Sequence, residues 1–98
     1  MYKEMYPHDD LVNLSEELVF EQIHQVILEG KEAFNQSEVS VQDIAAIALN
    51  KMPPKYVTNI LEKQSPSASL RDEVEDLRRY ARRQVIKAIK RVNEHPHD

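Results

Sequence analysis

Apolar residues recur every three or four positions in two long stretches of the chain, as they do on one face of a helix. The first stretch covers residues 13–29, where Asn13 suits the N-terminal cap and Gly30, the only glycine, suits the C-terminal cap. The second covers residues 70–93, where the apolar positions come close to a heptad repeat and Ser69 suits the cap. The pattern therefore predicts an N-terminal helix and a longer C-terminal helix.

A shorter stretch between them, residues 44–49, contains only apolar side chains and predicts a helix that is buried nearly all round. We expect Ser40 to cap this helix, because Asp43 stands at the answering position three residues later. Asn50 tolerates the left-handed conformation in which many helices end. The sequence thus predicts a third helix, from about residue 40 to residue 50.

Two consecutive prolines, Pro53 and Pro54, forbid any continuation of this helix, since they lack the N–H group and restrict the residue before them. We call residues 51–56 the proline elbow. Lys55 and Tyr56 directly follow the prolines, so they are expected to stand on a stiff segment. The run after them, residues 57–62, fits either a short helix or an extended segment.

Composition points in the same direction as the periodicity. One glycine in 98 residues argues against β-hairpins, whose tight turns need positive φ. We therefore predict an all-α fold, a single small helical domain of three to four helices over residues 1–98, with a long C-terminal helix. Residues 1–11 are expected to form an irregular arm and residues 94–98 a frayed tail. Because so small a domain gains from burying more apolar area, we expect a homodimer.

The residues around the proline elbow form a dense motif, made of Asp43, Ile44, Ala46, Ala48, Leu49, Asn50, Met52, Pro53, Pro54, Lys55 and Tyr56. This motif resembles the signature of the bacterial late competence protein ComFB family. The resemblance implies a small helical dimer with a regulatory role linked to competence, and some members of the family are implicated in binding cyclic dinucleotides. Many relatives carry a C-x-x-C pair suited to zinc, but the corresponding residues here are Ser37 and Ser40. Because hydroxyls are poor zinc ligands, we expect no metal and no cofactor.

Charge is distributed unevenly along the chain. The net charge is −4, yet residues 78–91 hold seven basic and no acidic side chains. The remaining residues carry the other six basic and all seventeen acidic side chains, which leaves them at −11. An overall negative charge disfavours a general nucleic-acid-binding protein. No apolar run approaches the roughly 20 residues needed to span a bilayer, and no signal peptide is apparent, so we expect a cytoplasmic protein without membrane contact.

Catalysis finds no support, because the chain has no cysteine, no glycine-rich phosphate loop and no recognisable Ser-His-Asp layout. The candidate ligand-binding residues are those of the elbow and the basic run: Lys55, Tyr56, Arg78, Arg79, Arg82 and Arg83. Guanidinium groups hold phosphates through forked hydrogen bonds, and tyrosine rings stack on bases. The alternative is that the arginines pair with the acidic surplus elsewhere. The apolar stripe expected at the dimer interface is Leu70, Val74, Leu77, Ala81, Val85 and Ala88.

Three functional hypotheses follow. The first is a non-enzymatic dimeric receptor or adaptor that binds cyclic di-GMP or cyclic di-AMP and signals to an unknown effector protein. The family resemblance favours this hypothesis, and the residues alone would not select it. The second is a protein–protein adaptor that binds no nucleotide. The third is a competence accessory protein that binds nucleic acid through the basic run, which the negative net charge disfavours.

Overall fold

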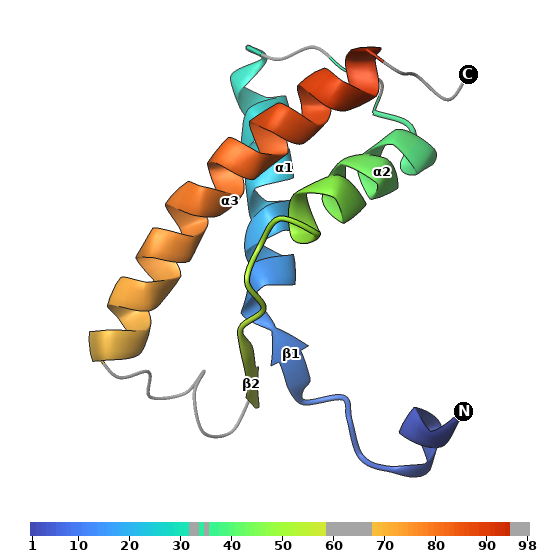
Figure 1. Cartoon of the computed structure of the whole chain (residues 1–98), viewed down its shortest axis with the longest axis vertical. Helices are drawn as coiled ribbons and strands as arrows, with labels where there is room; N and C mark the ends of the chain where they lie inside the picture. Colours follow the sequence, from blue (N-terminus) through green and yellow to red (C-terminus); the bar gives the residue numbers. More distant parts are fainter. Residues whose placement is uncertain (32–33, 35, 59–67, 95–98) are drawn as a thin grey trace.

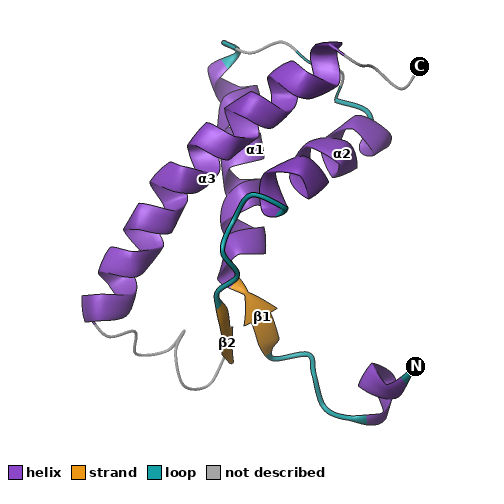
Figure 2. Ribbon diagram, viewed as in Figure 1, coloured by secondary structure: helices purple, strands orange, loops and turns teal. Residues whose placement is uncertain are grey.

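The computed structural model describes residues 1–31, 34, 36–58 and 68–94, and these residues form a mostly helical domain with a small sheet (Figures 1 and 2). In chain order the elements are η1 (Tyr2–Met5), β1 (Leu11–Asn13), α1 (Leu14–Glu29), α2 (Glu38–Leu49), β2 (Tyr56–Thr58) and α3 (Ala68–Glu94). The long α3 crosses α1, and α2 packs against both of them. The predicted long C-terminal helix is therefore confirmed.

Helix α1 begins and ends as its sequence predicts. The side-chain oxygen of Asn13 accepts a hydrogen bond from the backbone N–H of Ser15 at 3.1 Å, which satisfies one of the free donors of the first turn. Gly30 ends the helix with φ 68°, in the left-handed region, and its N–H donates to the Val26 carbonyl at 3.1 Å. The prediction of this helix is confirmed.

Helix α2 differs from its prediction at both ends. Its cap is Ser37, whose hydroxyl accepts from the Ser40 N–H at 3.3 Å, so Ser40 lies in the first turn and not at the cap. Asn50 has φ −66° and ψ −14°, which is right-handed, and the chain continues the turn through Lys51 and Met52. The predicted left-handed ending was wrong because a helical turn followed by the prolines is enough to end the helix.

The prediction of a purely α-helical fold was wrong. Strands β1 and β2 form a two-stranded antiparallel sheet with the register Leu11↔Thr58, Val12↔Val57 and Asn13↔Tyr56. The scarcity of glycine excludes tight hairpin turns, but these strands are joined through α1 and α2 and need no such turn. The sheet also shows that residues 57–58 are extended; residues 59–67 lie outside the described part of the chain.

Helix α3 starts at Ala68, so Ser69 lies within it and is not its cap. Most of the stripe expected to contact a second copy lies in the core with α1 and α2 of the same chain: Leu77, Ala81, Val85 and Ala88 are buried there, and the half-buried Val74 packs against them. Leu70 is also buried but is not part of that core cluster. Most of these residues therefore pack in the core of their own chain, and their place at a dimer interface stays a prediction.

The core lies where the three helices meet. Val19 of α1, Ile44 of α2 and Ile89 of α3 are all fully buried there. Small side chains allow the helices to approach closely, since Ala48 and Ala81 are also fully buried. A core this small is sensitive to the loss of single methyl groups.

The arm that precedes the helical domain contains an ordered short helix, η1, within the predicted irregular segment. Its large side chains stay exposed, with Tyr2 at 82% and Tyr6 at 67% of their full accessible surface. Figure 1 shows the arm extending away from the three helices. At the other terminus α3 ends at Glu94, and the predicted frayed tail falls, apart from Glu94 itself, outside the described residues.

Helix α3 has 27 residues and would be long enough to cross a lipid bilayer. Its charged side chains, however, make it far too polar to do so. No helix in the described part of the chain is both long and apolar enough to span a membrane.

Candidate functional site

Three hydrogen bonds fix the proline elbow to the start of α1. The side-chain oxygen of Asn13 accepts from the Lys55 N–H at 2.9 Å, and the Lys55 carbonyl accepts from the Leu14 N–H at 2.7 Å. The buried hydroxyl of Ser15 donates to the Pro53 carbonyl at 2.5 Å. Because the same Asn13 oxygen also caps α1, the elbow and the helix start share one anchor. The stiffness expected from the prolines is thus reinforced by tertiary contacts.

The elbow presents Tyr56 to solvent and Lys55 to α3. In β2 the neighbouring Val57 is buried, so alternation along the strand turns Tyr56 outward, where 61% of its surface is exposed. The ammonium of Lys55 lies 3.1 Å from a carboxylate oxygen of Glu73, near the start of α3. The predicted approach of the elbow to the last helix therefore occurs within one chain.

Two of the predicted arginines face α1. Arg78 donates to Glu21 at 2.7 Å and also pairs with Glu75, and Arg82 donates to Glu29 at 2.5 Å. The hydrogen bond from Arg82 lowers the pKa of Glu29, against the opposing effect of desolvation. The hydrogen bond to Glu21 raises the pKa of Arg78 above its ordinary value. These arginines therefore link α3 to α1 as a pair of interhelical ion pairs.

The other two predicted arginines lie on the more exposed side of α3. Arg79 pairs with Asp76, three residues earlier, at 2.5 Å. The guanidinium carbon of Arg83 lies 5.4 Å from the centre of the Tyr80 ring, in the range of a cation–π contact. Arg83 is therefore the member of the basic run that combines a cation with an aromatic face.

The six predicted ligand-binding residues do not meet at one point in a single chain. Glu73, which holds Lys55, precedes Arg78 by five residues and Arg82 by nine, which places them about 140° and 180° around the helix at roughly 100° per residue. Lys55 therefore contacts one flank of α3, while Arg78 and Arg82 face α1 on another. Their convergence, expected from the sequence, does not occur within one chain.

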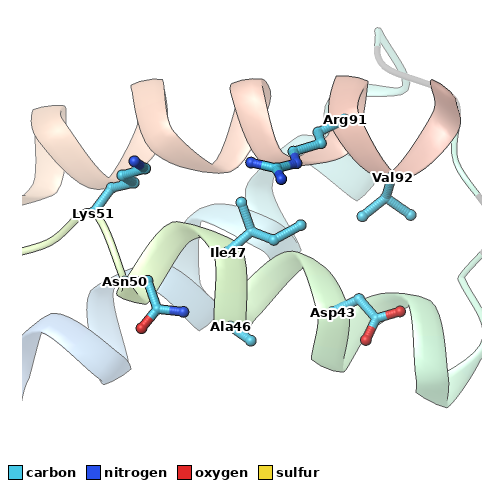
Figure 3. A pocket seen from close by; sticks show the side chains of 7 residues that line it. All are labelled: Asp43, Ala46, Ile47, Asn50, Lys51, Arg91 and Val92. Carbon is cyan, nitrogen blue, oxygen red and sulfur yellow. The ribbon is translucent and has the colours of Figure 1, made fainter. Parts of the chain in front are cut away.

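A pocket that the sequence did not reveal lies between α2 and the C-terminal half of α3 (Figure 3). It has a volume of about 420 Å³ and is lined mainly by Asp43, Ile47, Asn50, Lys51, Arg91 and Val92. One signal was visible, because Asp43, Ile47 and Asn50 recur at helical spacing and so share a face of α2. The partner residue Arg91 stands some forty positions later, and its contribution depends on tertiary packing.

The two serines at the positions of the family's cysteine pair contact each other. The Ser37 hydroxyl donates to the Ser40 hydroxyl at 3.2 Å, in addition to capping α2. Within the residues that the structure describes, no three histidine, aspartate or glutamate side chains gather as a metal-binding cluster. The serine pair thus has a structural role at the start of α2.

Comparison with known proteins supports the family resemblance that the motif indicates. The family model of the late competence development protein ComFB matches residues 12–96. Among solved structures, the chain is similar to the late competence protein ComFB from Bacillus subtilis, with a TM-score of 0.67 and 24% identity over 90% of this chain and 93% of that one. At this identity the structural likeness establishes the fold. No curated protein matches the chain significantly.

Proposed function

Because the chain belongs to the late competence development protein ComFB family, we propose that it is a non-enzymatic regulatory receptor or adaptor that binds a cyclic dinucleotide. The ligand is cyclic di-GMP or cyclic di-AMP, and its site is the outer face of the proline elbow. The protein acts as a homodimer and passes the binding event to an effector protein.

The observation that carries this proposal is an exposed tyrosine ring on a fixed backbone. Tyr56 keeps 61% of its surface exposed, while the residue before it is held by hydrogen bonds to Asn13 and Leu14. A ring held in this way loses little conformational entropy when a purine stacks on it. Stacking of a base on an aromatic side chain contributes about 1–3 kcal/mol. Lys55 next to the ring supplies a cation for a phosphate that replaces Glu73, whose carboxylate lies 3.1 Å from the Lys55 ammonium.

The arginines contribute to this site only if a second copy brings them to the elbow. Arg78 and Arg82 lie on a different flank of α3 from Lys55, so one protomer cannot offer all of them to one ligand. A phosphate would also have to replace the carboxylate that each arginine now contacts. In a homodimer, the elbow of one copy and the arginines of the other can surround a ligand that has two phosphates and two purines.

The alternative adaptor function, without a nucleotide, is favoured by one observation. Arg78, Arg79 and Arg82 each contact a carboxylate of their own chain, which is the arrangement expected if the basic run serves the fold. In that case the elbow and α3 would present a surface to another protein and would hold no phosphate.

Isothermal titration calorimetry with cyclic di-GMP and cyclic di-AMP separates the two functions. We expect heat of binding for the intact protein and a loss of affinity of between about fivefold and about 160-fold in Tyr56→Ala, from the range of base stacking energies of about 1–3 kcal/mol. The matched control is Tyr6→Ala, which removes an equally exposed ring from the arm. Arg82→Ala should weaken binding only if a second copy completes the site.

The receptor function is ruled out if neither nucleotide gives heat or a thermal shift at high micromolar concentration. An equal loss of affinity in Tyr56→Ala and Tyr6→Ala would show that the elbow is not the site. Unchanged affinity in Tyr56→Ala would show the same.

A further inference from the structure

The pocket between α2 and α3 combines an apolar floor with charged edges. Ile47 is half-buried and Val92 is buried at its base, while Ala46 on the same face of α2 is exposed. The structure therefore leaves an apolar strip of α2 uncovered beside α3, although Ile44, Ala45 and Ala48 of the same helix are buried in the core. The pocket is open, and its seven lining side chains are seen from close by in Figure 3.

The cations of this pocket differ from the other candidate binding cations, those of the elbow and of the arginines near the start of the basic run. Lys55, Arg78, Arg79 and Arg82 each contact a carboxylate. Lys51 and Arg91 are exposed and form no ion pair with any residue that the structure describes. The pocket also holds one carboxylate, that of Asp43, and Figure 3 shows Asp43 at one end and Lys51 at the other, with the Arg91 guanidinium directed toward the Lys51 end. The Lys51 end is therefore electropositive.

The shape and chemistry of the pocket select among ligands. A volume of about 420 Å³ falls in the usual range for ligand pockets and exceeds what a bare inorganic anion fills. The aliphatic floor would gain nothing from such an anion, but it suits an aliphatic side chain next to a carboxylate. Asn50 at the rim can both donate to and accept from a peptide group, because its side chain is itself an amide.

We infer that this pocket binds an acidic, aliphatic peptide segment of a partner protein. Lys51 and Arg91 hold the carboxylate of a glutamate or aspartate side chain, the floor formed by Ile47 and Val92 receives an adjacent leucine or isoleucine, and Asn50 bonds the peptide backbone. The site is separate from the outer face of the elbow and does not require a nucleotide. It is the site through which the protein, in the regulatory function proposed above, contacts its effector.

A pair of peptides that differ in a single charge tests this site. The probe is N-acetyl-Leu-Glu-Leu-Leu-amide, and its neutral counterpart has glutamine in place of glutamate. In titrations of the ¹⁵N-labelled full chain followed by amide chemical shifts, the glutamate peptide should move the signals of Ile47, Asn50 and Arg91. Its affinity should exceed that of the glutamine peptide by about tenfold, as expected for a charge-assisted hydrogen bond in a partly exposed site.

Arg91→Glu should abolish binding of the glutamate peptide. The matched control is Lys90→Glu, which makes the same charge change on the neighbouring residue, which is also exposed but does not line the pocket. Binding retained in Lys90→Glu and lost in Arg91→Glu supports the proposal, provided that circular dichroism shows both variants to be folded. If Arg91→Glu does not fold, the same comparison is made with Lys51→Gln.

Three results would overturn the inference. Equal affinity for the glutamate and glutamine peptides would show that the cations hold no carboxylate. Equal losses in Lys90→Glu and Arg91→Glu would show general charge attraction. Shifts at Ile47 and Arg91 caused by cyclic di-GMP, and not by either peptide, would assign the pocket to the nucleotide. Failure of nucleotide binding with peptide binding intact would count against the proposed receptor function alone, so the two failures are distinguishable.

Discussion

Replacement of Asn13 by alanine tests whether the proline elbow is held by α1. One oxygen of Asn13 accepts from two backbone donors, the Ser15 N–H at 3.1 Å and the Lys55 N–H at 2.9 Å. Alanine removes the helix cap, which costs about 1 kcal/mol. It also leaves the half-buried Lys55 N–H without its partner, which costs about 1 kcal/mol more at the lower end of the usual range. We therefore expect Asn13→Ala to lower the free energy of unfolding by about 2 kcal/mol.

Urea denaturation and thermal melting give the global effect, and a loss of this size should lower the melting temperature of a domain this small by about 8–16 °C. Amide hydrogen exchange gives the local effect, since the Lys55 amide should lose more protection than the global destabilisation explains. Asn13→Asp is the matched control, because its carboxylate keeps both hydrogen bonds and suits the positive end of α1. A loss below about 0.5 kcal/mol, well under the cost of one cap, or unchanged exchange at Lys55, would refute the shared anchor.

Three further predictions concern the rest of the fold. Ile44→Ala should destabilise the protein by about 3–4 kcal/mol in urea denaturation, because the side chain is fully buried among the three helices, and a loss below about 1 kcal/mol would contradict that packing. Gly30→Ala should lower the free energy of unfolding by about 1 kcal/mol in the same assay. The cause is the left-handed φ of 68° alone, because an added Cβ would meet no atom within 4 Å. An unchanged free energy of unfolding would show that the helix end relaxes. Because Arg82 lowers the pKa of Glu29, the stability that this pair provides is present above the ordinary pKa of a glutamate and is lost as the pH falls through the lowered value, below about pH 4. Acid denaturation should show this component in the parent and not in Glu29→Gln, and identical pH profiles would count against it.

The long helices were predictable because their signals are local. Asn13 and Gly30 stand at the two ends of a periodic stretch, and each behaves as its residue type suggests. The start of α2 was predicted three residues too late. Ser37 and Ser40 are both good capping residues, but the helix begins directly after Ser37, so Ser40 lies in its first turn. The sheet was missed because two three-residue strands more than forty positions apart leave no periodic signal, and their pairing depends on how α1 and α2 fold back.

The local features of the candidate site were likewise predictable, but its tertiary contacts were not. The prolines showed that Lys55 and Tyr56 stand on a stiff segment, but not that Asn13 would hold it. The charge run on α3 was evident, and the pairing of Arg79 with Asp76 follows from their spacing of three. The partners that Arg78 and Arg82 find on α1, however, could not be assigned by spacing. The burial of the apolar stripe of α3 was missed for a related reason, because a heptad-like apolar face can also be covered by helices of the same chain, as most of this one is.

The binding of a cyclic dinucleotide at the proline elbow is tested most directly by titrating cyclic di-GMP and cyclic di-AMP into the ¹⁵N-labelled protein and following its amide signals. If the elbow is the site, the signals of Lys55, Tyr56 and Val57 shift with one of the two nucleotides and stay fixed in Tyr56→Ala. Unchanged elbow signals with both nucleotides at high micromolar concentration would contradict the proposed function.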